Sequence, residues 1–150
     1  MQRVTNCILK QQDQVLLLKK PSRGWYAMPG GKMEQGESLK ESVVREYREE
    51  TGLHLIDPSL RGIFTMVKIE DDVIQREWMM FTFVCEVSQG EIVDFCREGE
   101  LEWVPIENVL DKPMAPSDRY IHRKLLFDNK VTHGIFNYTT NYELLNHRLE

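Results

Sequence analysis

The sequence lacks the features that mark a membrane-spanning, secreted or disulfide-bonded protein. No apolar run approaches the roughly 20 residues needed to cross a bilayer, and the opening residues, MQRVTNCILKQQDQ, lack the apolar stretch of a secretory signal. The three cysteines, Cys7, Cys85 and Cys96, are odd in number and show no C-x-x-C spacing, which argues against a disulfide framework or a structural zinc site. We therefore expect a soluble, cytoplasmic protein with no membrane partner and with buried, reduced thiols.

Excess positive charge is also absent. Nineteen Lys and Arg stand against 24 Asp and Glu, which gives a net charge of −5. Such a chain has no overall basic field for a nucleic-acid backbone, so we expect a small-molecule substrate and no stably bound nucleic acid. The motifs G-x-x-x-x-G-K-[ST], G-x-S-x-G and H-E-x-x-H do not occur. The four histidines are scattered, and we expect them to be surface or hydrogen-bonded residues. The sequence leaves the oligomeric state open.

The 150 residues contain no repeat and no linker-like stretch, so a single domain over residues 1–150 is expected. Short β-favouring runs predict strands on both sides of one helical segment, and the first two runs form a hairpin around the polar Lys10–Gln14. A mixed sheet with helices packed on its faces, an α/β (α+β) fold, is the simplest architecture for this pattern. The predicted strands are Val4–Leu9, Val15–Leu18, Tyr26–Met28, Leu60–Lys68, Val73–Val87, Leu101–Val104 and Val131–Thr139.

The strongest helical signal covers Leu39–Glu50. Ser38 and Glu41 have the spacing of a capping box at its start, and Gly52 follows as a C-terminal cap. This helix and the residues before it are unusually acidic, with six acids against three bases between Glu34 and Glu50. A helix that carries this surplus needs an explanation.

Three of these acids, Glu46, Glu49 and Glu50, fall within an arc of about 100° that borders the apolar face of the helix. One interpretation is a solvated face held by ion pairs such as Glu41 with Arg45 and Arg45 with Glu49. That interpretation leaves like charges crowded beside the core, where repulsion and desolvation both oppose folding. The other interpretation is a bound cation.

Carboxylate oxygens are hard ligands, so Mg²⁺ is the natural cation, with Mn²⁺ as a substitute. A metal held by acids favours a polyphosphate ligand, whose oxygens complete the coordination shell. The preceding Pro29-Gly30-Gly31 places two residues without side chains beside the acidic helix, where a glycine carbonyl can reach the metal. The residues alone therefore point to a divalent metal site with a polyphosphate ligand.

The segment GKMEQGESLKESVVREYREETGL resembles the signature of the Nudix hydrolases. Tyr47 departs from it, because an aliphatic residue is usual there. The flanking segments Trp25–Lys32 and Glu98–Trp103 resemble the MutT-type branch of that family. The matching residues are Gly31, Glu37, Arg45, Glu46, Glu49, Glu50, Gly52 and Leu53.

The resemblance implies an α/β/α sandwich and Mg²⁺-dependent hydrolysis of a nucleoside diphosphate linked to another group. For a MutT-type enzyme it implies that a nucleoside triphosphate, with an oxidised purine such as 8-oxo-dGTP, is cleaved to the monophosphate and pyrophosphate, which cleanses the nucleotide pool and prevents DNA damage. The alternatives are hydrolysis of ADP-ribose, a diadenosine polyphosphate or an RNA 5′ end, and a non-catalytic module that senses a nucleotide.

The resemblance also implies roles for individual residues. Glu46, Glu49 and Glu50 are the expected metal ligands, together with the carbonyl of Gly30, and Glu49 and Glu50 are the expected catalytic glutamates. Arg45 would orient a catalytic glutamate. Glu98 resembles the downstream acid that serves as an extra ligand or general base, and Glu100 competes for that role. The remaining matched residues, Glu37, Gly31 and Gly52, are expected to be structural.

Substrate-binding residues are less firmly indicated. Lys20, Arg23 and Lys32 are candidates for binding the distal phosphates, and each is equally compatible with a solvated surface position. A second helix is predicted over Arg119–Phe127, and Asp118 before it either contacts the purine, as the MutT-type resemblance implies, or caps the helix. Further candidates for a base slot, which are also compatible with core positions, are Trp25, Phe64, Met66, Trp78, Met80, Phe81 and Asn6.

Overall fold

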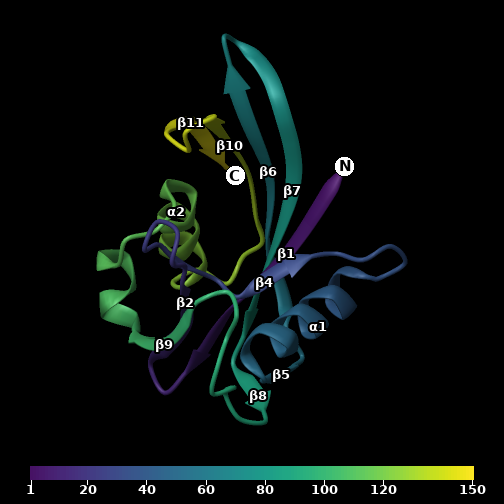
Figure 1. The fold of residues 1–150 in the computed structure, drawn as a ribbon, viewed down its shortest axis with the longest axis vertical. Coiled ribbons are helices and arrows are strands. Elements are labelled where there is room, and N and C mark those ends of the chain that lie inside the picture. The colour runs from purple at the N-terminus through teal and green to yellow at the C-terminus, as the bar shows by residue number, and fades with distance from the viewer.

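A computed structural model describes all of residues 1–150, which form strands, two α-helices and a short 3-10 helix (Figure 1). In chain order the elements are β1 (Gln2–Gln11), β2 (Gln14–Lys19), β3 (Tyr26–Ala27), β4 (Gly30–Lys32), α1 (Leu39–Thr51), β5 (His54–Ile56), β6 (Ser59–Glu70), β7 (Val73–Cys85), β8 (Val87–Gln89), β9 (Glu100–Pro105), η1 (Ile106–Asp111), α2 (Pro116–Leu125), β10 (Thr132–Thr139) and β11 (Leu144–Leu149).

Nine strands form one mixed sheet. Its order is β11-β10-β6-β7-β1-β2-β3, with β4 also pairing β1 and β9 also pairing β2. β1 is parallel to β7 and antiparallel to β2 and β4, so the first strand links the two halves of the sheet. The hairpin predicted around Lys10–Gln14 is confirmed, and its turn residues Gln12 and Asp13 both have positive φ, as tight hairpin turns require.

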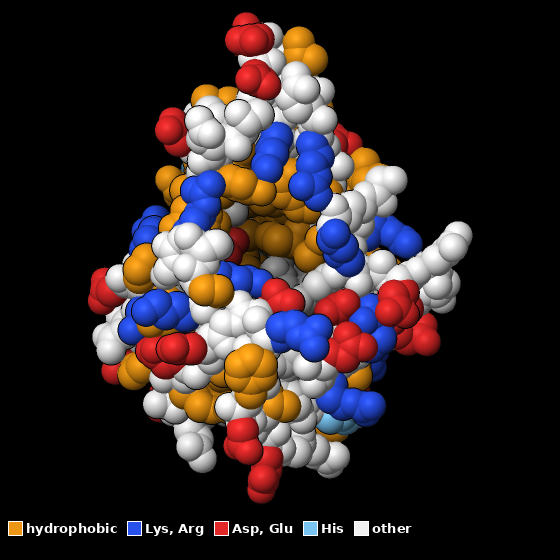
Figure 2. All heavy atoms as spheres, in the orientation of Figure 1, with side chains coloured by type: hydrophobic (Ala, Val, Ile, Leu, Met, Phe, Trp, Pro, Cys, Tyr) orange, Lys and Arg blue, Asp and Glu red, His pale blue; other side chains and the backbone are white.

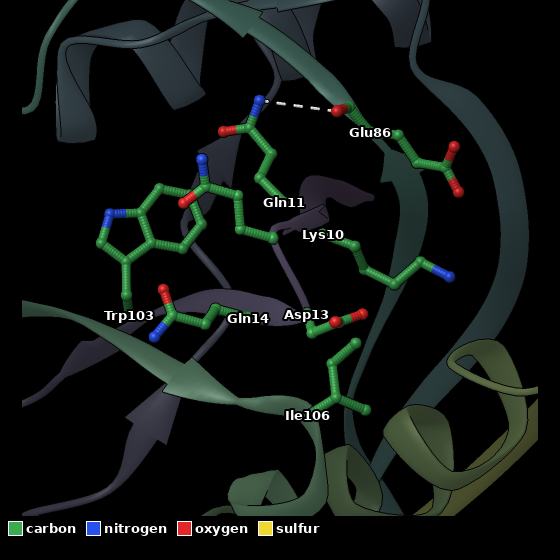
Figure 3. Close-up of a pocket in the computed structure, with 8 residues that line it drawn as sticks. Lys10, Gln11, Asp13, Gln14, Glu86, Trp103 and Ile106 are labelled. Atoms are coloured by element: carbon green, nitrogen blue, oxygen red, sulfur yellow. Dashed lines mark hydrogen bonds between the residues drawn. The ribbon is translucent and has the colours of Figure 1, made fainter.

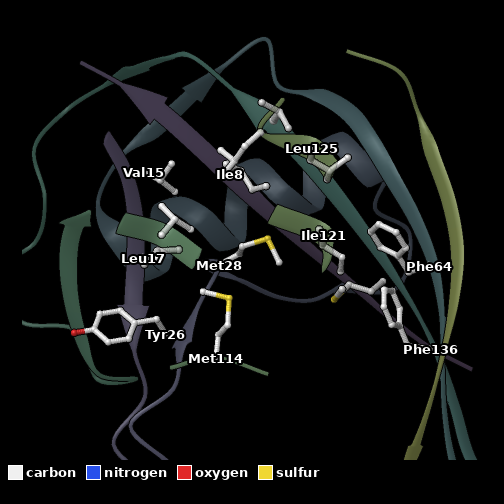
Figure 4. Close-up of a cluster of buried hydrophobic side chains, with 14 of the residues drawn as sticks. Ile8, Val15, Leu17, Tyr26, Met28, Phe64, Met114, Ile121, Leu125 and Phe136 are labelled. Atoms are coloured by element: carbon white, nitrogen blue, oxygen red, sulfur yellow. The ribbon is translucent and has the colours of Figure 1, made fainter. Parts of the chain in front are cut away.

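Side chains of β1 alternate between two hydrophobic cores, one on each face of the sheet. Cys7 and Leu9 belong to a cluster of nine buried residues that includes side chains of α1. Ile8 belongs to a cluster of 17 buried residues that includes Ile121 of α2 (Figure 4). Because neighbouring residues of a strand point to opposite faces, α1 and α2 cover opposite faces. The predicted sandwich of helices around a mixed sheet is confirmed.

Local signals position α1 beside the core. The Ser38 hydroxyl accepts a hydrogen bond from the Glu41 N–H, and the Glu41 carboxylate accepts one from the Ser38 N–H, at 3.1 and 2.9 Å. Glu41 therefore closes the capping box, and the ion pair with Arg45 considered above does not form. The helix ends at Thr51, one residue beyond the prediction, where Gly52 adopts φ 86°. Tyr47 is fully buried in the smaller core.

The second helix differs from its prediction. α2 begins at Pro116, whose fixed φ suits the first helical position, and Ala115 is the capping residue. Asp118 lies inside the first turn, so the N-cap alternative for this residue is wrong. The helix ends at Leu125, two residues before the predicted end at Phe127. Phe127 instead lies in the turn that follows, where it is 68% exposed.

Four short strands, β4, β5, β8 and β11, escaped prediction in full or in part. The run predicted over Val73–Val87 ends as β7 at Cys85, and Val87 begins β8, which pairs only with β5. β11 is a mostly exposed edge strand paired only with β10. Such strands are defined by their partner rather than by an apolar pattern of their own.

Two expectations about single residues are also settled by burial. Cys7 and Cys85 are buried free thiols as expected, whereas Cys96 is half-buried. His122 is fully buried with neither ring nitrogen hydrogen-bonded, so the expectation that it lies on the surface or is hydrogen-bonded is wrong. Burial lowers the pKa of His122 to about 4, which keeps the ring neutral within the core.

Neither α-helix has the length and apolar character needed to traverse a bilayer.

Candidate active site

Carboxylates from the last turns of α1 face the loop that joins β8 to β9. The i, i+3 and i+4 spacing places Glu46, Glu49 and Glu50 on one side of the helix. Across from them the loop contributes Glu98, together with the 81% exposed Phe95. These residues line one cavity of about 440 Å³. The structure therefore brings together the four acids that the sequence singled out, from segments almost 50 residues apart.

Arg45 is the hub of hydrogen bonds at this site. Its Nε and Nη2 donate to the two oxygens of Glu37 at 2.5 and 2.9 Å, and its Nη1 donates to Glu46 at 2.9 Å and Glu49 at 3.1 Å. Nη2 also donates to the Lys32 carbonyl at 3.2 Å. The paired hydrogen bonds from Arg45 lower the pKa of Glu37 to about 2. One guanidinium thus fixes three carboxylates and ties α1 to β4.

Two glycines allow β4 to approach both β1 and the helix. A Cβ atom on Gly31 would overlap the Glu46 carboxylate, and one on Gly30 would overlap the Thr5 carbonyl of β1. Gly30 also makes a backbone hydrogen bond to the carboxylate of Glu50. The adjacent glycines are therefore required by close contact rather than by a turn alone.

Glu50 is the acid of the cavity whose pKa is shifted most clearly. Burial raises its pKa to about 7, and the charges of Glu98 and Glu46 contribute in the same direction. The Lys20 charge and the backbone hydrogen bond from Gly30 oppose this rise. A carboxylate that titrates near neutrality in a cavity is suited to accept and release a proton.

The shifted pKa of Glu50 predicts a pH-dependent stability for the metal-free protein. An acid with a higher pKa in the folded state stabilises the fold below its ordinary value of 4.5, and this contribution is lost as pH rises through about 7. Because Glu50 is partly exposed and solvent screens its charge, we expect the free energy of unfolding to lose roughly 1 to 2 kcal/mol over this range.

Urea unfolding of the metal-free protein at several pH values between 4.5 and 8 measures this effect. The Glu50→Gln variant should show a flatter profile and should exceed the wild type in stability at pH 8. Parallel profiles for the two proteins would contradict the assignment of the shift to Glu50.

The four carboxylates of this cavity offer the oxygen donors that Mg²⁺ and Mn²⁺ prefer, and Glu50 has no arginine partner; the lining also contains Cys96 and Arg97. In the present arrangement no three acidic, histidine or cysteine side chains converge as a ligand set. Arg45 engages Glu46 and Glu49 instead. Arg45 bonds only one oxygen of Glu46 and one of Glu49, so the second oxygen of each carboxylate is left for a metal ion.

The structure separates the three candidate phosphate-binding residues. Lys20 lies at the cavity, with its Nζ 4.0 Å from Glu98. Lys32 is exposed, and it is its backbone carbonyl that meets Arg45. Arg23 lies over the ring of Trp25 in its own loop and over the ring of Tyr142, as described below. Only Lys20 joins the glutamates directly.

The candidates for a base slot lie mainly in the core. Phe64, Met66 and Met80 are buried, and the buried Asn6 side chain donates to the Met80 sulfur at 3.4 Å. Asp118 lies on α2, on the sheet face opposite α1, and is half-buried. Loss of solvent around its carboxyl group raises its pKa to about 7. Its one side-chain hydrogen bond comes from the Ser117 hydroxyl, at 3.4 Å.

The two competing downstream acids are clearly separated. Glu98 precedes β9 and lines the cavity, whereas Glu100 begins β9, where it pairs with Lys19, and is not among the cavity residues.

A larger cavity of about 680 Å³ lies at the β1–β2 turn, where Lys10, Trp103 and several glutamine side chains surround it (Figure 3). It contains none of the residues that the sequence singled out.

The comparison with protein families decides the identity of this fold and site. A profile of the NUDIX domain matches residues 1–125. The chain belongs to the Nudix hydrolase family. It is therefore an enzyme that acts on pyrophosphate bonds of nucleotide derivatives, as the glutamate spacing indicated, and the family generally uses divalent metal ions.

Similar Nudix proteins cover the whole chain. An uncharacterized Nudix hydrolase of Bacillus subtilis, YvcI, is 49% identical over 150 residues, which are 100% of this chain and 95% of YvcI. A crystal structure of a mutator MutT protein from Bacillus halodurans superposes with a TM-score of 0.98 at 49% identity, covering 100% of this chain and 98% of that one. The MutT-like character of the Nudix fold is confirmed.

More distant relatives are described by different substrates. An ADP-ribose pyrophosphatase of Methanocaldococcus jannaschii is 31% identical over 81% of this chain and 68% of its own. The human 8-oxo-dGDP phosphatase NUDT18 is 33% identical over 73% of this chain and 33% of its own. Both named substrates contain a nucleoside diphosphate with a phosphoanhydride bond, and they differ in the base and in the group attached to the diphosphate.

Proposed function

We propose that this Nudix hydrolase cleaves a nucleoside triphosphate with an oxidised purine, of the 8-oxo-dGTP type, to the monophosphate and pyrophosphate, and so cleanses the nucleotide pool. The observation that carries the proposal is the shared cavity of Glu46, Glu49, Glu50 and Glu98, one of which titrates near neutrality. The 33% identical relative that acts on 8-oxo-dGDP supports the oxidised guanine.

The proposed metal ligands are Glu46, Glu49, Glu50, Glu98 and the carbonyl of Gly30, with Mg²⁺ as the ion and Mn²⁺ as a substitute. The bound metal would neutralise phosphate charge and lower the pKa of a coordinated water. Arg45 would position Glu46 and Glu49 through the hydrogen bonds described above. Glu37, Gly31 and Gly52 would keep the helix and β4 in place.

The proton of the attacking water needs an acceptor. Glu50 is the proposed acceptor, because its pKa near 7 lets it take up a proton at neutral pH, and Glu98 is the second candidate in the same cavity. Lys20 beside Glu98 is placed to bind phosphate oxygens. Arg23 and Lys32 are proposed to bind the phosphates farther from the scissile bond.

Asp118 is the proposed contact to the purine edge. A carboxyl with a pKa near 7 exists in both forms at neutral pH, so it can accept a hydrogen bond from the base or donate one to it. An oxidised guanine differs from guanine in one acceptor and one donor of its edge, which is the kind of difference that such a group can distinguish.

We further propose that residues 1–150 form one domain in the cytoplasm, without membrane or stable nucleic-acid partners. The strands beyond the matched region support one domain, because β10 pairs with β6 along its whole length and Phe136 and Tyr138 belong to the same core as Ile8. The location remains a prediction.

A substrate panel tests the proposed function. It compares dGTP, 8-oxo-dGTP, ADP-ribose, diadenosine tetraphosphate and a triphosphorylated RNA oligonucleotide with Mg²⁺, and resolves monophosphate from diphosphate products. We expect 8-oxo-dGTP to show the highest kcat/KM, with monophosphate and pyrophosphate as products. Preference for ADP-ribose, favoured by the archaeal relative, would replace the substrate assignment and keep the site. Binding of nucleotides without any turnover would instead indicate a sensing module.

A further inference from the structure

The C-terminal hairpin holds an aromatic residue in an uncommon backbone conformation. Tyr142, in the turn between β10 and β11, has φ 63°, in the left-handed region that bulky side chains rarely adopt. The turn is closed by the Tyr142 N–H, which donates to the Thr139 carbonyl at 3.0 Å, and by the Thr139 N–H, which donates to the Glu143 carbonyl at 2.8 Å. Strain at a bulky residue suggests that its side chain has a task.

The ring of Tyr142 contacts two cations from distant segments. Lys68 Nζ of β6 lies 3.8 Å from the ring centroid, and Arg23 Cζ of the β2–β3 loop lies 5.0 Å from it. Arg23 also lies 4.9 Å from the centroid of Trp25, so its guanidinium rests against two rings. The hairpin therefore joins two basic side chains that are 45 residues apart in sequence.

Both cations keep their hydrogen-bond donors available. All salt bridges of the chain involve other basic residues, and no side-chain hydrogen bond is made by Arg23 or Lys68. A guanidinium packed against rings still presents its N–H groups at the edge of its plane, and an ammonium above a ring still has donors that point away from it. Aromatic contacts thus orient the charges without neutralising them.

The loop that carries Arg23 connects this cluster to the proposed substrate site. The loop with Arg23 is closed by hydrogen bonds between Lys20 and both Gly24 and Trp25, and Lys20 reaches Glu98 of the glutamate cavity. On β6, Lys68 stands opposite Arg76 of β7, one step beyond the row of Met66 and Trp78 on the same sheet face. Figure 2 shows a hollow with a hydrophobic floor and several Lys and Arg side chains at its rim.

We propose that Tyr142 is a positioning residue that holds Arg23 and Lys68 ready to bind phosphate oxygens of the nucleotide. This inference rests on the proposed function, since it concerns the same substrate site. It assigns a role to the hairpin beyond residue 125, where the match to the family profile ends. It also adds Lys68, which no motif in the sequence distinguishes.

The test measures the affinity of the full-length protein for inorganic tripolyphosphate with Mg²⁺ by calorimetry. Tyr142→Gly removes the ring and favours the left-handed turn, because glycine adopts positive φ without strain. We expect Kd to rise about 10-fold, the effect of losing one charged hydrogen bond. Lys68→Met should show a similar rise, and Tyr142→Phe, which keeps the ring, should remain within about twofold of the wild type.

Leu145→Ala is the matched control, because this residue is 52% exposed on β11 of the same hairpin and should leave Kd unchanged. Melting temperatures show whether each variant is folded. Wild-type affinity in folded Tyr142→Gly and Lys68→Met, or no binding of tripolyphosphate by the wild type, would overturn the positioning role. Failure of the proposed function looks different, because the wild type would then bind tripolyphosphate in a Tyr142-dependent way but hydrolyse nothing in the panel.

Discussion

Replacement of Glu50 by glutamine is expected to lower turnover of the preferred nucleotide by at least about 10²-fold while the protein remains folded. The amide keeps the shape of the side chain but can neither accept the proton nor offer an anionic oxygen to a metal. Glu49→Gln is expected to have an effect of the same order, since Glu49 lines the same cavity. Steady-state kinetics with a saturating metal concentration measures both variants.

Glu100→Gln provides the matched control. The same chemical change is made only two residues from Glu98, at a residue that is not part of the cavity lining. Its turnover should remain within about twofold of the wild type. Near-wild-type turnover in folded Glu49→Gln and Glu50→Gln would show that the acidic cavity is not the reaction centre.

Removal of divalent metal is expected to produce the second large effect, a loss of turnover of at least about 10²-fold. Four acids share the cavity, whereas Arg97 is the one basic residue in its lining and only Arg45 and Lys20 form ion pairs with the acids, so the folded protein carries a surplus of negative charge there. Chelation by EDTA followed by readdition of Mg²⁺ or Mn²⁺ should abolish and then restore the rate.

Melting temperature supplies a second readout that does not depend on activity. Mg²⁺ should raise it in the wild type, because the ion binds the folded state only, and should raise it much less in Glu50→Gln. An EDTA-resistant rate, or an equal thermal shift in both proteins, would contradict a metal site at these glutamates.

Local sequence signals were sufficient to predict α1, the helix that carries most of the candidate site residues. The capping box, the apolar spacing and Gly52 predicted α1 to within one residue, because each acts on neighbouring positions of the same helix. β4, β5 and β11 were missed, and the start of β8 was merged with β7, because pairing with other strands defines these short elements. A cap was one of the two alternatives for Asp118 because aspartate is a common capping residue, whereas Pro116 already begins the helix.

The same difference between local signals and long-range contacts decides which residues of the candidate site could be predicted. Helical periodicity alone brought Glu46, Glu49 and Glu50 together, and the family resemblance added Glu98. The choice between Glu98 and Glu100 required the start of β9 to be known. The contact of Tyr142 with Lys68 joins a turn and a strand more than 70 residues apart, and no local pattern marks such a pair.

The shared guanidinium of Arg45 has a consequence for how this site tolerates change. Glu46 and Glu49 both accept from Nη1 of Arg45, and Glu37 accepts from Nε and Nη2, so one guanidinium holds all three acids. Their energetic contributions are therefore coupled, and the effect of a double substitution will not equal the sum of the single ones. The effect of replacing one of these three acids thus depends on which of the other two are still present.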